Sequence, residues 1–157
     1  MGAPSVRLLA SAKLEHERET DMEYATLKEK IAAHKIARAD RDAAFADIWK
    51  EAWEAGHAAG AACKPRAMHV SDMKGNLIET VSDGACGFAW LTVRGANKGF
   101  GHWLIKQGLA KVGYTGGAQV WISNYNQSYE RKAAHAYAMA RVLEANGIKA
   151  YSDGRLD

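Results

Sequence analysis

The chain has 157 residues, of which 48% are hydrophobic and 25% charged, a balance typical of a folded domain rather than a disordered one. No apolar run approaches the roughly 20 residues that a membrane-spanning helix needs. The chain has only two cysteines, too few for a disulfide-rich scaffold, so we expect reduced thiols.

The sequence changes character near Lys64–Pro65, because twelve of the fifteen glycines and all the strand-like runs follow this point. Proline disfavours helical geometry in the residue before it. We therefore predict a helical N-terminal extension over residues 1–63 and an α/β module over residues 64–157. The extension has 9 basic and 11 acidic residues, and the module has 12 basic and 7 acidic residues. The module is basic, which permits an anionic partner.

Helix is predicted from about Thr20 to Cys63, beginning at a capping box formed by Thr20 and Glu23. Two arrangements fit this stretch. One is a single long helix, and the other is a helical hairpin bent at residues 38–42, where Asp40 could cap the second helix.

The first part of this stretch carries only a narrow apolar stripe, formed by Tyr24, Leu27 and Ile31. A helix with so little apolar surface is hardly stable alone. We therefore expect the stripe to bind the second helix, another copy of the chain, or a partner protein.

The elements predicted for the module combine a hairpin with strands and helices. They are a hairpin over residues 67–81, strands over 86–93, 119–123 and 148–152, a short helix over 97–107 and a long helix over 128–146. The small residues Ala133, Ala136 and Ala140 share one face of the long helix, which predicts close packing on a sheet. The predicted fold class is α+β: an N-terminal helical arm or hairpin, then a small mixed β-sheet with two packed helices.

Potential metal ligands and catalytic groups are scattered along the chain. The residues concerned are Cys63, His69, Cys86, His102 and His135. None of them has the CxxC, HxxxH or HExxH spacing of a zinc site, so we predict neither a metal nor a cofactor. A pairing of Cys86 with His102 or His135 would suit nucleophilic catalysis. Cysteine within an apolar strand is usually a core residue, so no catalytic residue is predicted.

Aromatic and cationic residues alternate in the module, a composition that suits single-stranded nucleic acid, which is held by stacking and charge. The tryptophans, including Trp90 and Trp121, are expected to fill the core of so small a domain. A Gly-rich link around Arg94 and Lys98 could hold an anion at a helix start. The predicted nucleic-acid or anion-binding residues are Arg94, Lys98, Arg131, Lys132, Tyr125 and Tyr129.

Several strings of this sequence resemble a small family of proteins carried by tailed bacteriophages. They are CGFAW, FGHWLIKQGLA, YTGG, VWISNYNQSYERKAAHAYAMARVLEANGIKAY and the terminal GRLD. The resemblance covers roughly Trp53 to Asp157. The family has no assigned activity, so it implies no catalytic residue. It implies a phage-encoded protein acting in the bacterial host cytoplasm or in a virion.

Together these patterns favour a non-enzymatic phage accessory protein. Its basic C-terminal module would bind nucleic acid or a nucleic-acid-handling machine. The alternative is a protein-binding factor that inhibits a host protein or builds an assembly through its N-terminal helices, which would also allow a homo-oligomer.

Overall fold

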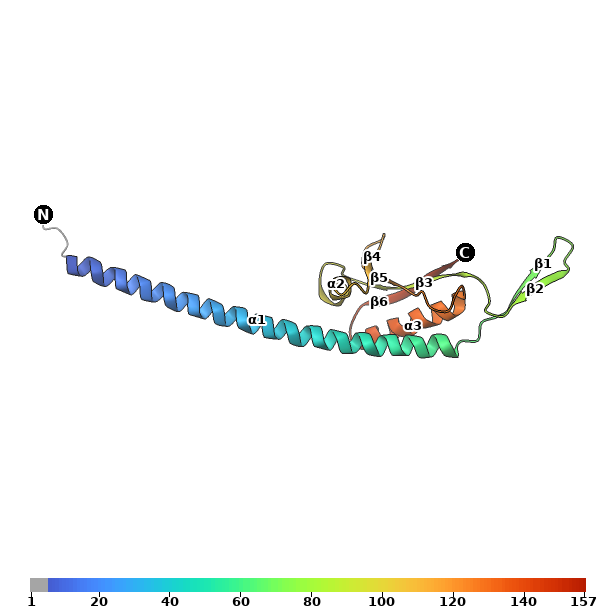
Figure 1. The fold of residues 1–157 in the computed structure, drawn as a ribbon, viewed down its shortest axis with the longest axis horizontal. Coiled ribbons are helices and arrows are strands. Elements are labelled where there is room, and N and C mark those ends of the chain that lie inside the picture. Colours follow the sequence, from blue (N-terminus) through green and yellow to red (C-terminus); the bar gives the residue numbers. More distant parts are fainter. Residues whose placement is uncertain (1–5) are drawn as a thin grey trace. The chain divides into compact units, whose positions relative to one another are not determined.

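A computed structural model describes residues 6–157, with side chains from residue 17 onwards, and it confirms the α+β class (Figure 1). Helix α1 (Val6–Ala62) is uninterrupted, so the single long helix is the correct alternative. The helix start predicted at Thr20 is wrong. The Thr20 hydroxyl instead donates back to the Glu17 carbonyl at 2.9 Å, as threonine often does within a helix. No helix in the described part of the chain is long and apolar enough to cross a membrane.

The chain divides into two compact units within α1, between Ala43 and Ala44. The boundary predicted at residues 63 and 64 coincides instead with the end of the helix. The physical reason is that the last part of α1 belongs to the core of the second unit. Ala52 is fully buried there, and the Phe45 ring lies edge-on to the Phe100 ring at 5.2 Å.

The second unit contains two antiparallel sheets. A four-stranded sheet has the order β4-β5-β3-β6. Its strands are β3 (Gly87–Val93), β4 (Lys111–Val112), β5 (Ala118–Trp121) and β6 (Ala150–Leu156). Strands β1 (Met68–Ser71) and β2 (Leu77–Val81) form a separate hairpin.

Every strand pairing among the described residues is antiparallel, whereas the sequence predicts a mixed sheet. The chain passes from strand β5 through a helix to strand β6, an order that is typical of two neighbouring parallel strands. The two strands do run in the same direction, but β3 lies between them and is antiparallel to both. The two-residue strand β4 has no counterpart among the predicted elements.

The last strand is longer than the sequence predicts, because the charged tail pairs with β3 up to Leu156 opposite Gly87. Two glycines allow this extension to lie close to the long helix. A Cβ atom on Gly87 or Gly154 would lie 3.0 or 2.9 Å from the Tyr129 ring. The glycines therefore make the space that this ring occupies.

Helices α2 (Gly99–Lys106) and α3 (Tyr129–Ala145) pack on the sheet face formed by Ala89, Leu91 and Val93. Ala136 and Ala140, predicted to face the sheet, are buried at 0% and 4% exposure. Helix α3 and the loop before it also contact α1. A Cβ atom on Gly56 would overlap the ring of His135 on α3, and one on Gly60 would overlap the ring of Tyr125 in that loop. The core is therefore built on one face of the sheet.

Enlarging the small face of α3 should destabilise the second unit. We expect Ala136→Leu to cost about 1–3 kcal/mol of unfolding free energy, because the added atoms have no space at this buried position. Ala145→Leu on the exposed end of the same helix is the matched control and should change stability by less than about 0.5 kcal/mol. Chemical denaturation would measure both, and an unchanged Ala136→Leu variant would show that this face is loosely packed.

Candidate ligand-binding face of the sheet

The second face of the four-stranded sheet is aromatic. Residues directly opposite each other on paired strands share a face, and here Trp90 lies opposite both Trp121 and Asp153, while Phe88 lies opposite Arg155. The hydrophobic core, as far as the structure describes the chain, includes none of these side chains. We call Phe88, Trp90, Trp121 and Tyr151 the aromatic face.

Three rings of the aromatic face form a contiguous row. The Trp90 and Trp121 rings have centroids 4.9 Å apart and an interplanar angle of 35°. The Phe88 ring lies edge-on to Trp121 at 6.1 Å. Trp121 is 49% exposed and Tyr151 is 43% exposed, so aromatic surface is accessible to a ligand. A contiguous exposed aromatic patch is more informative than a single exposed apolar residue.

Basic side chains lie beside these rings. The Arg155 guanidinium lies 5.5 Å from the centre of the Phe88 ring, and Arg155 itself is exposed. Lys111 is exposed and lies opposite Gln119 on the same face. Asp153 is the acidic residue of this face, so the two cations outnumber it. Planar rings with adjacent cations can bind a flat, anionic ligand.

The residues predicted to form one basic rim lie in two separate places. Arg94 and Lys98 follow the end of β3, and both are exposed. Arg131 and Lys132 lie near the beginning of β3, where the Lys132 amine donates to the Gly87 carbonyl at 3.1 Å. Strand β3 has 7 residues, so at about 3.3 Å per residue the two places are roughly 20 Å apart.

The second group makes internal contacts. Lys132 is only 5% exposed, and its hydrogen bond to the strand explains why a cation is accommodated in the first turn of α3. The Arg131 Nε lies 3.8 Å from the Asp83 carboxylate. Arg94 and Lys98 are thus the predicted cations that remain accessible.

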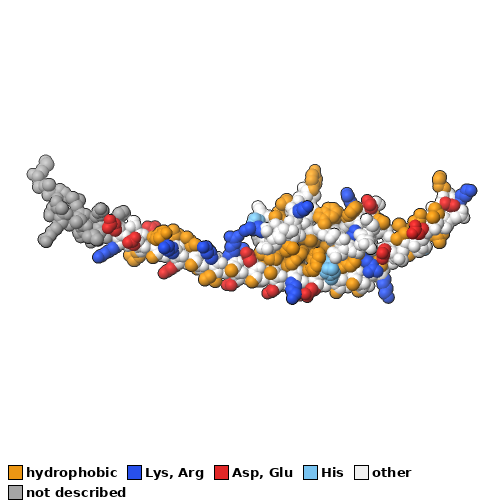
Figure 2. Space-filling model, viewed as in Figure 1, with side chains coloured by type: hydrophobic (Ala, Val, Ile, Leu, Met, Phe, Trp, Pro, Cys, Tyr) orange, Lys and Arg blue, Asp and Glu red, His pale blue; other side chains and the backbone are white. Residues whose placement is uncertain are grey.

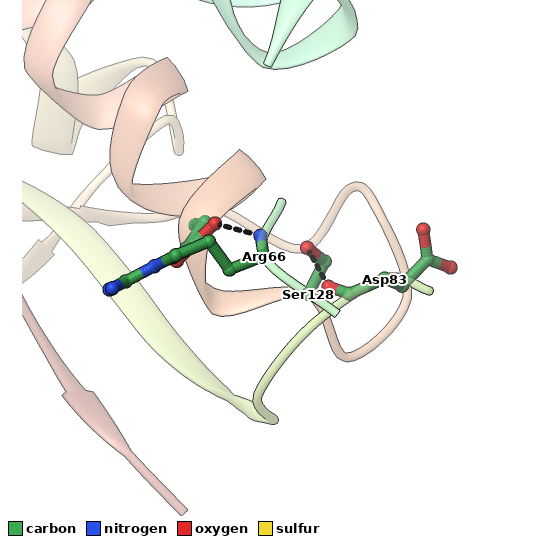
Figure 3. A network of polar contacts seen from close by, with 4 residues as sticks. Arg66, Asp83 and Ser128 are labelled. Atoms are coloured by element: carbon green, nitrogen blue, oxygen red, sulfur yellow. Dashed lines mark hydrogen bonds and ion pairs between the residues drawn. The ribbon is translucent and has the colours of Figure 1, made fainter. Parts of the chain in front are cut away.

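Polar contacts hold the start of α3 against two loops (Figure 3). The Ser128 hydroxyl donates to the Asp83 carbonyl at 2.7 Å. The backbone N–H of Arg66 donates to the Glu130 carboxylate, also at 2.7 Å. These bonds fix the loops next to the beginning of β3, and they leave the Ser128 side chain without a helix-capping bond.

The two predicted tyrosines also serve packing. The Tyr129 ring lies over Gly87 and Gly154, and the Tyr125 ring lies against Gly60. The Tyr125 hydroxyl lies 3.0 Å from His135 Nδ1 and donates to the His57 carbonyl at 3.4 Å. Burial raises the pKa of Tyr125, so this hydroxyl keeps its proton at neutral pH.

His135 is fully buried between α3 and α1, next to the Trp53 ring at 4.9 Å. Its Nε2 has no hydrogen-bond partner among the described residues and faces Gly56. Burial and then the adjacent His57 lower the pKa of His135 to about 4, so the ring is neutral at pH 7.

The other potential catalytic residues, Cys86 and His102, do not contact His135 in any interaction found among the described residues. Cys86 is half-buried and forms a β-bridge with Ser128, which is seven residues from His135 and therefore about 10 Å away along α3. His102 is exposed and contacts the Ala96 carbonyl at 3.3 Å. No group of three or more His, Cys, Asp or Glu residues suited to a metal ion exists in the described part of the chain.

The predicted partner-binding stripe belongs to the first unit. Tyr24, Leu27 and Ile31 are exposed there, as is every residue from Glu17 to Arg41. Figure 2 shows charged side chains interrupting the hydrophobic ones along α1. The stripe is therefore available for binding.

Comparisons with protein-family models, with curated proteins and with solved structures give no significant match. The function of this chain is therefore inferred from its own geometry. The sequence predicts Trp90 and Trp121 in the core, whereas the core formed by the described residues includes neither. Their spacing of 31 residues gave no sign that they lie opposite each other on neighbouring strands.

The low pKa of His135 predicts a specific loss of stability in acid. The unfolded chain binds a proton at this histidine near pH 6.5, whereas the folded chain does so only near pH 4. The part of the unfolding free energy that depends on a neutral His135 is therefore fully present above about pH 6.5. It is lost as the pH falls towards 4, by on the order of 3 kcal/mol.

Urea denaturation at pH 7, 5.5 and 4.5 would measure this loss. His135→Gln should remove this part of the pH dependence, and His102→Gln, at an exposed histidine, is the matched control that should retain it. Equal pH dependence in the wild type and His135→Gln would contradict the assignment.

Proposed function

We propose that this chain is a binding protein that holds single-stranded nucleic acid on the aromatic face of its second unit. The observation that carries the proposal is the Trp90–Trp121 pair, whose rings lie 4.9 Å apart on the sheet face opposite the helices. Nucleobases stack on exposed aromatic rings whatever their sequence, and each such contact is worth about 1–3 kcal/mol.

The charge of the module supports the same ligand. Residues 64–157 have 12 basic and 7 acidic residues, and Arg155 and Lys111 are next to the rings. A cationic border attracts the phosphate backbone while the rings take the bases. Double-stranded nucleic acid keeps its bases stacked inside, so an aromatic face favours single strands.

The proposal is for a non-enzymatic role. The candidate nucleophile Cys86 and the candidate base His135 lie in separate packed positions, and His135 is fully buried. The resemblance to phage proteins extends the proposal to a protein that acts on nucleic acid, or on a machine that handles it, in a bacterial host cytoplasm or in a virion.

Removing the exposed indole should weaken this binding. We expect Trp121→Ala to reduce affinity for a single-stranded oligonucleotide by about 5–150-fold, which corresponds to one lost stacking contact. Fluorescence anisotropy with labelled single-stranded DNA and RNA would measure it at about 50 and 200 mM salt, and wild-type binding should weaken as salt rises.

Tyr137→Ala is the matched control, because Tyr137 is an exposed aromatic residue on α3 rather than on the sheet. It should bind like the wild type. If the wild type binds no single strand even at about 50 mM salt, the proposed function is wrong.

The second candidate function is protein binding through the first unit, and its specific observation is the exposed stripe. Residues 17–41 are all exposed, and an isolated helix with so few apolar contacts is marginal in water. We propose a second copy of this chain as the partner. The 3–4 spacing of Tyr24, Leu27 and Ile31 repeats in a coiled-coil seam, so two copies could bury the same stripe against each other.

Charging the stripe should prevent this self-association. We expect the double variant Leu27→Lys/Ile31→Lys to shift the wild-type dimer to a monomer in analytical ultracentrifugation. The control is Ala25→Lys/Ala33→Lys, which adds the same charge at exposed positions off the stripe. A wild type that is monomeric at high concentration would exclude the second copy as partner and leave a different protein as the alternative.

A further inference from the structure

Three cations converge on a pocket at the end of β3. The pocket has a volume of about 510 Å³ and lies between the loop that precedes α2 and the loop that precedes β6. Its basic lining residues are Arg94, Lys98 and Lys149, and Phe45, Phe100 and Ile148 provide an apolar part. The space suits a compact anionic group with an apolar neighbour.

The backbone holds the two loops together. The Arg94 N–H donates to the Lys149 carbonyl at 2.9 Å, which joins them directly. Gly95 has a φ of +89°, a conformation that other residues rarely adopt, so it fixes the turn between Arg94 and Lys98. The lining cations therefore come from segments with defined backbone positions.

No acidic residue is among the residues that line this pocket, and no ion pair found among the described residues involves Arg94, Lys98 or Lys149. Glu144, which lines an adjoining pocket, is 3.3 Å from Arg141. Like charges repel when they are brought together without a counter-charge. Three cations around one space thus favour an anionic ligand.

The adjoining pocket connects this space with the aromatic face. It has a volume of about 640 Å³ and shares Arg94 and Lys149 with the first pocket. It also reaches Tyr151, which belongs to the aromatic face and lies opposite Thr92 on β3. A ligand that stacks on the aromatic face can therefore extend past Tyr151 towards the three cations.

We infer that the pocket around Arg94, Lys98 and Lys149 binds the terminal phosphate of the single strand held on the aromatic face. This inference rests on the proposed function. A terminal phosphate monoester carries about −1.5 to −2 charges near neutral pH, more than the single charge of an internal phosphodiester. Three cations match the terminal group better than the internal one, and arginine can bind two phosphate oxygens at once.

The test compares one oligonucleotide with hydroxyl groups at both ends, with a 5′-phosphate and with a 3′-phosphate. We expect the phosphate at one end to increase affinity for the wild-type chain by roughly tenfold, the effect of a charged hydrogen-bonded contact. The double variant Arg94→Gln/Lys98→Gln should lose this increase. Lys64→Gln/Lys74→Gln removes the same charge at two exposed lysines elsewhere and should retain it.

Four results would overturn the inference, and they are distinguishable. Equal wild-type affinity for the three oligonucleotides, with binding still dependent on Trp121, would exclude the phosphate pocket and leave the aromatic face in place. An increase that persists in Arg94→Gln/Lys98→Gln would place the phosphate elsewhere. A free nucleoside monophosphate that binds as tightly as the phosphorylated strand would identify a small-molecule site instead. Absence of binding to all three oligonucleotides would contradict the proposed function itself.

Discussion

The close contact between α3 and the last part of α1 is the interaction on which the rest of the second unit depends. Gly56 and Gly60 leave no side chain where the rings of His135 and Tyr125 lie, so α3 and the loop before it can approach α1 closely. Helix α3 also packs its small face on β3 and β6. Because all this packing is on one face of the sheet, the other face remains for Trp90 and Trp121.

Hydrogen-bonding contacts explain why a histidine and a buried lysine are tolerated in so small a core. His135 stays neutral at pH 7, and its Nδ1 lies 3.0 Å from the Tyr125 hydroxyl, so one of its two ring nitrogens has a polar partner. The Lys132 amine donates to the Gly87 carbonyl at the sheet margin. The sequence predicted Lys132 as an anion-binding residue and indicated His135 only as a possible metal ligand or partner of Cys86. The structure gives each of them a structural role.

The sequence predicted the elements well where local chemistry decides them. The hydrophobic run of β3, the glycine after α3 and the proline after α1 are local signals, and the predicted bounds differ from the observed ones by a few residues. The sequence did not predict the features that depend on contacts with residues far away in the chain. The tail up to Leu156 becomes a strand only because Gly87 is opposite, and the boundary between the two units depends on Phe45 meeting Phe100.

The candidate site shows the same limit of sequence reasoning. Residue types predicted stacking and a cationic border, but strand register decides which of them meet. Trp90 and Trp121 share one face only because β3 and β5 pair at that position, and a shift of one residue would turn either side chain to the core. The residues of the predicted basic rim lie in two places, because Arg94 and Lys132 are near opposite ends of β3.

The alternative is that the Trp90–Trp121 pair only stabilises the sheet, and this role requires less than the observed arrangement. Cross-strand aromatic pairs stabilise a sheet by about 0.2–1 kcal/mol, and this gain needs only contact between the two rings. It does not need Trp121 to remain 49% exposed, nor cations beside the rings. An exposed indole in contact with Phe88, which itself lies beside Arg155, on a face that the helices leave free, agrees with the proposed ligand, which supplies both flat rings and negative charge.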